Sequence, residues 1–330
     1  MGGNEHTPTV SLCVAVAFCL SFGSEAERPA FPRWSKLNLV ATATPTQPSA
    51  KVRRATRPLA LWHLFSLDAP TVAALWTWFI ARAAHLRLPA FATLAMALAV
   101  WMLYAADRLM DARLLDARSA HEDTLEARHL FHHHHRSAFL SGIFAASVIL
   151  AALLPRLDSQ SIRLYLILGG LVFGYFVLIH AARSAHRLPK EIAVGIFFAA
   201  ATFIPTVARR PGLRLALLPP ALLFAVLCSL NCLFIYAWEH PALERSHPPN
   251  AATRLALRHL PLIATGVVLT GIALALLDRH TPWPIPFAAA IAAIFLLIVN
   301  RSRSHIHSTT LRASADMALL TPLLLLPFLR

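Results

Sequence analysis

"WMLYAADRLMDARLLDARSAHEDTLEAR", residues 101–128, begins as an apolar helix and ends as a run of charges. The apolar part extends back to residue 88, and 88–111 is long enough to cross the hydrocarbon core of a bilayer as a helix. Asp107 and Asp111 lie where the apolar run ends. The stretch therefore predicts a transmembrane helix with two carboxylates at one end.

The same pattern recurs through the 330 residues, which are 57% hydrophobic and 14% charged, with a mean hydropathy of +0.58. The apolar runs are continuous and lack period-two alternation, which favours helices over a β-barrel. We expect an all-α polytopic membrane protein with about nine transmembrane helices in one bundle. The expected helices are 59–82, 88–111, 138–154, 161–182, 189–208, 215–239, 259–277, 282–300 and 313–329.

Two parts of the chain differ in composition. Residues 1–57 combine a short apolar run with a polar, basic stretch, which predicts a poorly ordered N-terminal segment or, alternatively, a cleaved signal. Residues 58–330 form the expected transmembrane helical domain. In its first run, Pro70 favours a helix start near Asp68, with 59–67 in the membrane interface. The four cysteines form no Cys-x-x-Cys pair, so neither a zinc motif nor a disulfide framework is indicated.

The formal net charge is +14, and its Arg residues cluster in short loops between apolar runs. This distribution favours contact with membrane lipid headgroups over binding of nucleic acid. From Lys51 onward, 18 Lys and Arg residues fall on one side of the nine-helix topology and nine on the other. The positive-inside rule then places the N-terminus in the cytoplasm and the C-terminus outside, in the cell (inner) membrane.

Polar side chains gather at the cytoplasmic end of the expected bundle. Ionisable groups within membrane segments usually face a bundle interior or an aqueous cavity, so we expect one cavity at this end. The residues concerned are Asp107, Asp111, Lys190, Asn231, Glu239 and Asp316.

Asp107 and Asp111 are four residues apart and share a helix face, where two like charges repel unless a cation lies between them. Mg²⁺ accepts one or two carboxylates together with phosphate oxygens. The alternative is that both are solvated groups at a helix end. Asn231 likewise is either an interhelical hydrogen-bonding residue or a contact to metal or substrate.

Four stretches carry a resemblance to a known family: "YAADRLMDAR", "LPKEIAVGIFFAAATFIP", "NCLFIYAWE" and "SADMALLTPLL". With nine helices and cytoplasmic carboxylates, the chain resembles the UbiA superfamily of intramembrane prenyltransferases over about 59–330. The pattern of that family at helix 2 is Asn-Asp-x-x-Asp-x-x-x-Asp. Asp107 takes the place of the Asn and Asp111 that of the next Asp, whereas Arg108 replaces the second residue and Leu115 the last.

The resemblance implies Mg²⁺-dependent transfer of a prenyl group from a polyprenyl diphosphate to an aromatic or lipid acceptor. It implies Asp107 and Asp111 as catalytic residues that hold the metal together with Glu239. The substrate-binding residues that it implies are Arg108, Lys190, Asn231, Tyr236, Glu239 and Asp316. The alternative is a UbiA-like protein with a lipid-binding or assembly role or different chemistry, or a transporter.

Overall fold

The computed structural model describes residues 57–116, 134–181, 189–239, 250–306 and 308–329. The predicted N-terminal segment lies outside the described residues apart from Arg57, so the boundary of the transmembrane domain stays a prediction. All the regular structure in the described ranges is helical, and they contain no strand. The all-α prediction is confirmed for this part of the chain.

Each of the nine apolar runs forms helix. The long helices are α4 (Asp68–Ala83), α5 (Ala90–Asp116), α7 (Arg136–Leu153), α8 (Ser159–Ala181), α9 (Lys190–Arg209), α10 (Arg214–Glu239), α13 (Leu260–Leu277), α14 (Pro284–Arg301) and α15 (Ser308–Ala318), which the 3₁₀ segment η5 (Thr321–Phe328) continues. Two short helices, α3 (Arg57–Leu64) and α12 (Ala251–Arg258), and three 3₁₀ turns, η2 (Leu154–Arg156), η3 (Pro211–Leu213) and η4 (Arg303–His305), complete the described elements.

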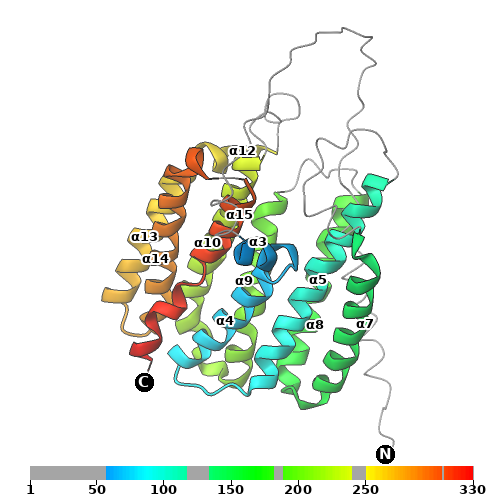
Figure 1. The fold of residues 1–330 in the computed structure, drawn as a ribbon. Helices are drawn as coiled ribbons and strands as arrows, with labels where there is room; N and C mark the ends of the chain where they lie inside the picture. The colour runs from blue at the N-terminus through cyan, green and yellow to red at the C-terminus, as the bar shows by residue number, and fades with distance from the viewer. Residues whose placement is uncertain (1–56, 117–133, 182–188, 240–249, 307, 330) are drawn as a thin grey trace, which may run out of the picture.

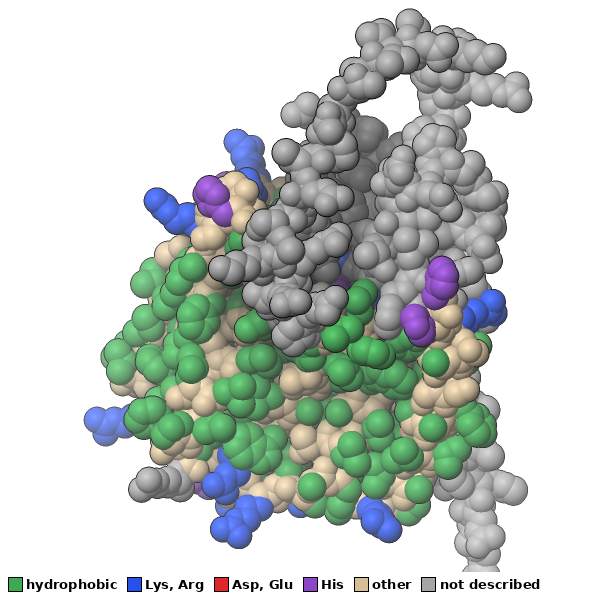
Figure 2. Space-filling view, in the orientation of Figure 1, with side chains coloured by type: hydrophobic (Ala, Val, Ile, Leu, Met, Phe, Trp, Pro, Cys, Tyr) green, Lys and Arg blue, Asp and Glu red, His purple; other side chains and the backbone are tan. Residues whose placement is uncertain are grey.

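Seven segments of the described chain are long and apolar enough to cross a membrane: Ala90–Leu109, Arg136–Arg156, Lys190–Arg209, Pro211–Trp238, Leu260–Leu277, Pro284–Arg301 and Thr310–Phe328. Helix α4, with 16 residues, and helix α8 are not among them. Figure 2 shows hydrophobic side chains over the middle of the visible face, with Lys, Arg and His side chains toward its upper and lower margins. These features are compatible with the predicted integral membrane protein.

The long helices run side by side (Figure 1). Helices α5 and α10 end at the upper margin of that view, where α9 and α15 begin. The C-terminus lies at the opposite margin. The helix ends that carry the predicted site residues therefore lie on one side of the molecule.

The main core is centred on α10, which packs most extensively against α9. Trp76 of α4 lies on Phe224 of α10, with ring centroids 4.1 Å apart. Small residues permit the closest helix contacts: a Cβ added to Gly195 of α9 would lie 2.3 Å from the backbone nitrogen of Ser229. Close backbone approach at small residues is typical of membrane helices.

Helix α7 sits at the edge of this arrangement and packs against α5. Its buried residues are Phe139, Ala146 and Leu153, which recur every seven positions. Phe139 stacks on Trp101 of α5 with ring centroids 6.4 Å apart. The contact surface of α7 is thus one narrow stripe along the helix.

The expected helix 59–82 is broken between α3 and α4. Ser66 adopts a positive φ of 54°, unusual for a residue with a side chain, and this reverses the chain direction locally. The Trp101 indole of α5 donates a 3.1 Å hydrogen bond to the Phe65 carbonyl and fixes the turn. Helix α4 then begins at Asp68, with Pro70 in its first turn, where a proline is tolerated. Both α3 and α4 contact α15, so the break between them lies beside the last helix.

Candidate functional site

His63 and Asp68 form a buried pair at the α3–α4 break. Nδ1 of His63 lies 2.5 Å from Oδ2 of Asp68, and both side chains are almost completely shielded from solvent. The other carboxylate oxygen, Oδ1, accepts a 3.0 Å hydrogen bond from the backbone N–H of Ala69. An acidic residue at this position also interacts favourably with the N-terminal end of α4. The turn at Ser66 thus joins two residues whose spacing of five would not pair them on a continuous helix.

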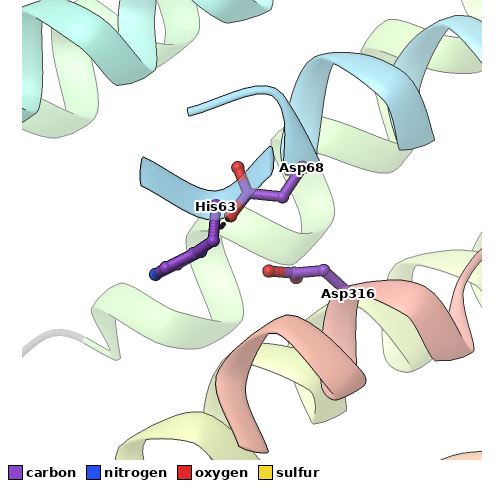
Figure 3. A group of neighbouring side chains, drawn as sticks. All are labelled: His63, Asp68 and Asp316. Atoms are coloured by element: carbon purple, nitrogen blue, oxygen red, sulfur yellow. Dashed lines mark hydrogen bonds and ion pairs between the residues drawn. The ribbon is translucent and has the colours of Figure 1, made fainter. Parts of the chain in front are cut away.

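Asp316 of α15 completes a group of three potential ligands. Figure 3 shows its carboxylate pointing toward the His63–Asp68 pair. The ligand atoms of the three side chains all lie within 4.8 Å of one another. From the other side, Nδ2 of Asn231 on α10 donates a 2.9 Å hydrogen bond to Oδ1 of Asp316. Residues from the first, sixth and ninth apolar runs therefore meet at one point.

Helix α5 contributes a buried positive charge to the same place. Arg108 is only 6% exposed, and its guanidinium interacts electrostatically with both Asp68 and Asp316. Tyr104, one turn earlier on the same face of α5, interacts electrostatically with the same carboxylates and with Arg108. We call His63, Asp68, Tyr104, Arg108, Asn231 and Asp316 the polar cluster.

The polar cluster lies well inside the helix ends. Arg108 is eight residues before the end of α5, Asn231 is eight before the end of α10, and Asp316 is eight after the start of α15. At 1.5 Å per residue, each lies about 12 Å from its helix terminus. Three helices thus carry their polar side chains to a common depth within otherwise apolar segments.

The charges of the polar cluster can balance internally. Two carboxylates face one guanidinium and one imidazole, so the cluster is neutral when His63 is protonated and both carboxylates are ionised. Not all its buried polar atoms are satisfied: Nε of Arg108 and Oδ1 of Asn231 have no hydrogen-bond partner among the described residues. Buried polar atoms normally have partners, so these two mark a place where water, an ion or a ligand group fits.

Of the predicted site residues, Arg108, Asn231 and Asp316 come together. Asp107 is half-buried near the end of α5, about 100° around the helix from Arg108. Lys190 is exposed at the start of α9, and Tyr236 is half-buried on α10.

The side chains of Asp111 and Glu239 lie outside the described residues. The expected face-to-face arrangement of Asp107 and Asp111 with Asn231 and Glu239 therefore stays a prediction, as does the Mg²⁺ assigned to it.

Sequence reasoning missed His63, Asp68 and Tyr104 as members of the site. Asp68 appeared only as a helix boundary, and His63 only as part of the stretch 59–67 expected in the membrane interface. The available signal was a carboxylate within an apolar run just before a proline, since ionisable groups in membrane segments usually have a partner.

The chain matches no protein-family model, and no match is found among curated proteins or solved structures. The likeness to the UbiA superfamily thus depends on the four quoted stretches alone.

Proposed function

We propose that the chain is a UbiA-like prenyltransferase that moves a prenyl group from a polyprenyl diphosphate to an aromatic or lipid acceptor. The observation that carries the proposal is the polar cluster, assembled from α3, α4, α5, α10 and α15. Its Arg108 and Asn231 lie eight residues, about 12 Å, before the ends of α5 and α10, at the margin of the molecule where α9 begins. A polar site between apolar helices suits a substrate that has a charged head and a hydrocarbon tail.

In this proposal Asp107, Asp111 and Glu239 hold Mg²⁺ near the mouth of the site. The carboxylate donors suit this hard ion. When bound, Mg²⁺ neutralises the charge that develops on the diphosphate as it leaves.

The remaining residues of the site bind and orient the substrates. Arg108 and Lys190 bind the diphosphate, and Asn231, Tyr236 and Asp316 line the substrate site. The membrane lipids around the helices supply an apolar route for the tail.

The proposed topology is a single bundle of nine spans, with α4 and α8 added to the seven candidate segments. The N-terminus is cytoplasmic and the C-terminus outside, in the cell (inner) membrane. The excess of Lys and Arg on one side supports this orientation.

One observation favours a second candidate, a lipid-binding or assembly protein with the same fold. The charges of the polar cluster can neutralise one another, and Arg108 occupies a place where the family pattern has a carboxylate. Such a cluster holds the helices together without a diphosphate.

Thermal unfolding of the purified protein separates the two candidates. A prenyl diphosphate should raise the apparent unfolding temperature only with Mg²⁺ present, since a ligand of the native state stabilises it. Asp111→Asn should weaken this binding at least tenfold, about 1.4 kcal/mol, without unfolding the protein. Asp116→Asn is the matched control and should have much less effect. Absence of Mg²⁺-dependent protection across several prenyl lengths would favour the second candidate.

A further inference from the structure

We propose that His63, Asp68 and Asp316 form a binding site for a divalent transition-metal ion of the Zn²⁺ type. The site is distinct from the Mg²⁺ site assigned to Asp107, Asp111 and Glu239. The inference depends on the geometry of the polar cluster alone and does not require prenyl transfer.

The positions of the three donor atoms carry the inference. A ring nitrogen of His63 and one oxygen from each carboxylate lie within 4.8 Å of one another. Bonds of about 2.0–2.2 Å to a tetrahedral Zn²⁺ place ligand atoms roughly 3.3 Å apart. His63 and Asp68 must therefore separate by less than about 1 Å, and Asp316 must approach by up to about 1.5 Å.

The donor types select the class of metal. One imidazole nitrogen with two carboxylate oxygens suits Zn²⁺ and its first-row neighbours, whereas Mg²⁺ and Ca²⁺ prefer oxygen ligands. Three protein ligands also leave a fourth position open, as in catalytic zinc sites. The imidazole donor thus gives this site a different metal preference from a site made only of carboxylates.

The surrounding residues supply the support that metal ligands need. Asn231 donates its 2.9 Å hydrogen bond to Asp316 and so orients that carboxylate, as residues around metal ligands commonly do. Asn231 is only 6% exposed, and its buried amide oxygen has no hydrogen-bond partner among the described residues. Its amide group, which contacts Asp316 through Nδ2, therefore has an unused acceptor beside the proposed ligands.

The charges of the polar cluster allow a cation that replaces a proton. Asp68 and Asp316 repel when both are ionised, and a metal binds the neutral form of an imidazole, so the ion takes the place of the His63 proton in the neutral cluster described above. When His63 is neutral, the two positive charges of the metal balance the two negative charges of the carboxylates. Arg108 then leaves one positive charge, which suits an anionic group or hydroxide at the open position.

The test measures binding of Zn²⁺ to the purified full chain in detergent. The background variant replaces His132, His133, His134 and His135 with Gln, because a run of histidines is a compositional metal-binding pattern that would compete with the site. We expect one Zn²⁺ per chain by isothermal titration and by elemental analysis after desalting. His63→Gln and Asp316→Asn should each weaken binding at least 100-fold, whereas excess Mg²⁺ should not displace the ion.

Control variants separate this site from its neighbours. His305→Gln removes an exposed imidazole and should leave Zn²⁺ affinity unchanged. Asp111→Asn should also leave it unchanged, although it weakens Mg²⁺-dependent binding of prenyl diphosphate. If the background variant binds prenyl diphosphate with Mg²⁺ but does not bind Zn²⁺, this inference alone is rejected. If it binds Zn²⁺ but no prenyl diphosphate, only the proposed function is rejected.

A measurement on the background variant, with no substitution in the site, covers the case in which the site variants fail to fold. X-ray absorption of the Zn²⁺-loaded protein should show one imidazole among oxygen ligands. Two or more imidazoles, no bound Zn²⁺, or an affinity insensitive to His63→Gln would overturn the proposal.

Discussion

Asn231 of α10 donates a hydrogen bond of 2.9 Å to Asp316 of α15, joining two segments 85 residues apart in the chain. In lipid, apolar helices gain little from contact with one another beyond packing, because the tails around them are equally apolar. A hydrogen bond between two membrane helices therefore contributes orientation as well as stability.

A double-mutant cycle measures this contribution. Asn231→Leu leaves the Asp316 carboxylate without its donor and should destabilise the protein by about 1–3 kcal/mol. Asp316→Leu should do the same, and the double variant should lose less than the two single losses combined. Denaturant titration in detergent gives the three values. Strict additivity would show that the bond does not couple the helices.

Gly195 and Gly266 offer a matched pair of Gly→Ala substitutions. A methyl group at Gly195 meets the backbone of Ser229 at 2.3 and 2.6 Å, so α9 and α10 must separate. At Gly266 of α13, nothing lies within 4 Å, and alanine removes an unfavourable helix residue.

We expect Gly195→Ala to lower the thermal unfolding temperature and Gly266→Ala to leave it unchanged or raise it. The helix-propensity gain of roughly 1 kcal/mol applies at both positions, so the difference between the variants reports the contact with Ser229. An unchanged unfolding temperature for Gly195→Ala would contradict the close packing.

Trp76 anchors the C-terminal segment. Its indole donates a 2.8 Å hydrogen bond to the Leu319 carbonyl, where α15 gives way to η5. Trp76→Phe keeps an aromatic ring beside Phe224 but leaves this carbonyl without its donor, so we expect a loss of about 1–3 kcal/mol. Trp283→Phe, at an exposed tryptophan, is the control and should cost less. Chemical denaturation followed by circular dichroism provides the comparison.

The ends of α9 and α14 test the topology. Arg210 follows α9 and Arg303 follows α14, at opposite ends of the molecule. Reporter fusions at these positions should report opposite sides of the membrane, with Arg303 in the cytoplasm. Finding both reporters on the same side would reject the nine-span model.

The sequence predicts the helices far better than the site. Long apolar runs specify helix because backbone groups must pair within the segment, and all nine runs are helical. Helix α12 was missed because it is short and polar, although Asn250 caps its start. Asn231 and Asp316 were predicted as site residues because polar groups within apolar runs are conspicuous.

The partners of those two residues were harder to identify. The pairing of His63 with Asp68 requires the left-handed conformation of Ser66. No sequence pattern around Ser66 predicts this conformation. The inward direction of Arg108 depends on how α5 is rotated against α4 and α10, and this rotation is set by packing across the whole molecule. Spacing along one helix therefore assigns residues to a face but leaves unspecified which face meets the interior.

The narrow stripe of buried residues on α7 bears on the order of assembly in the membrane. Only Phe139, Ala146 and Leu153 of α7 are buried, whereas α10 contributes many residues to the main core. Packing against the other helices therefore stabilises α7 less than it stabilises α10. We expect α7 to insert independently and join the other helices late. It should also be the first helix to separate when the lipid composition changes.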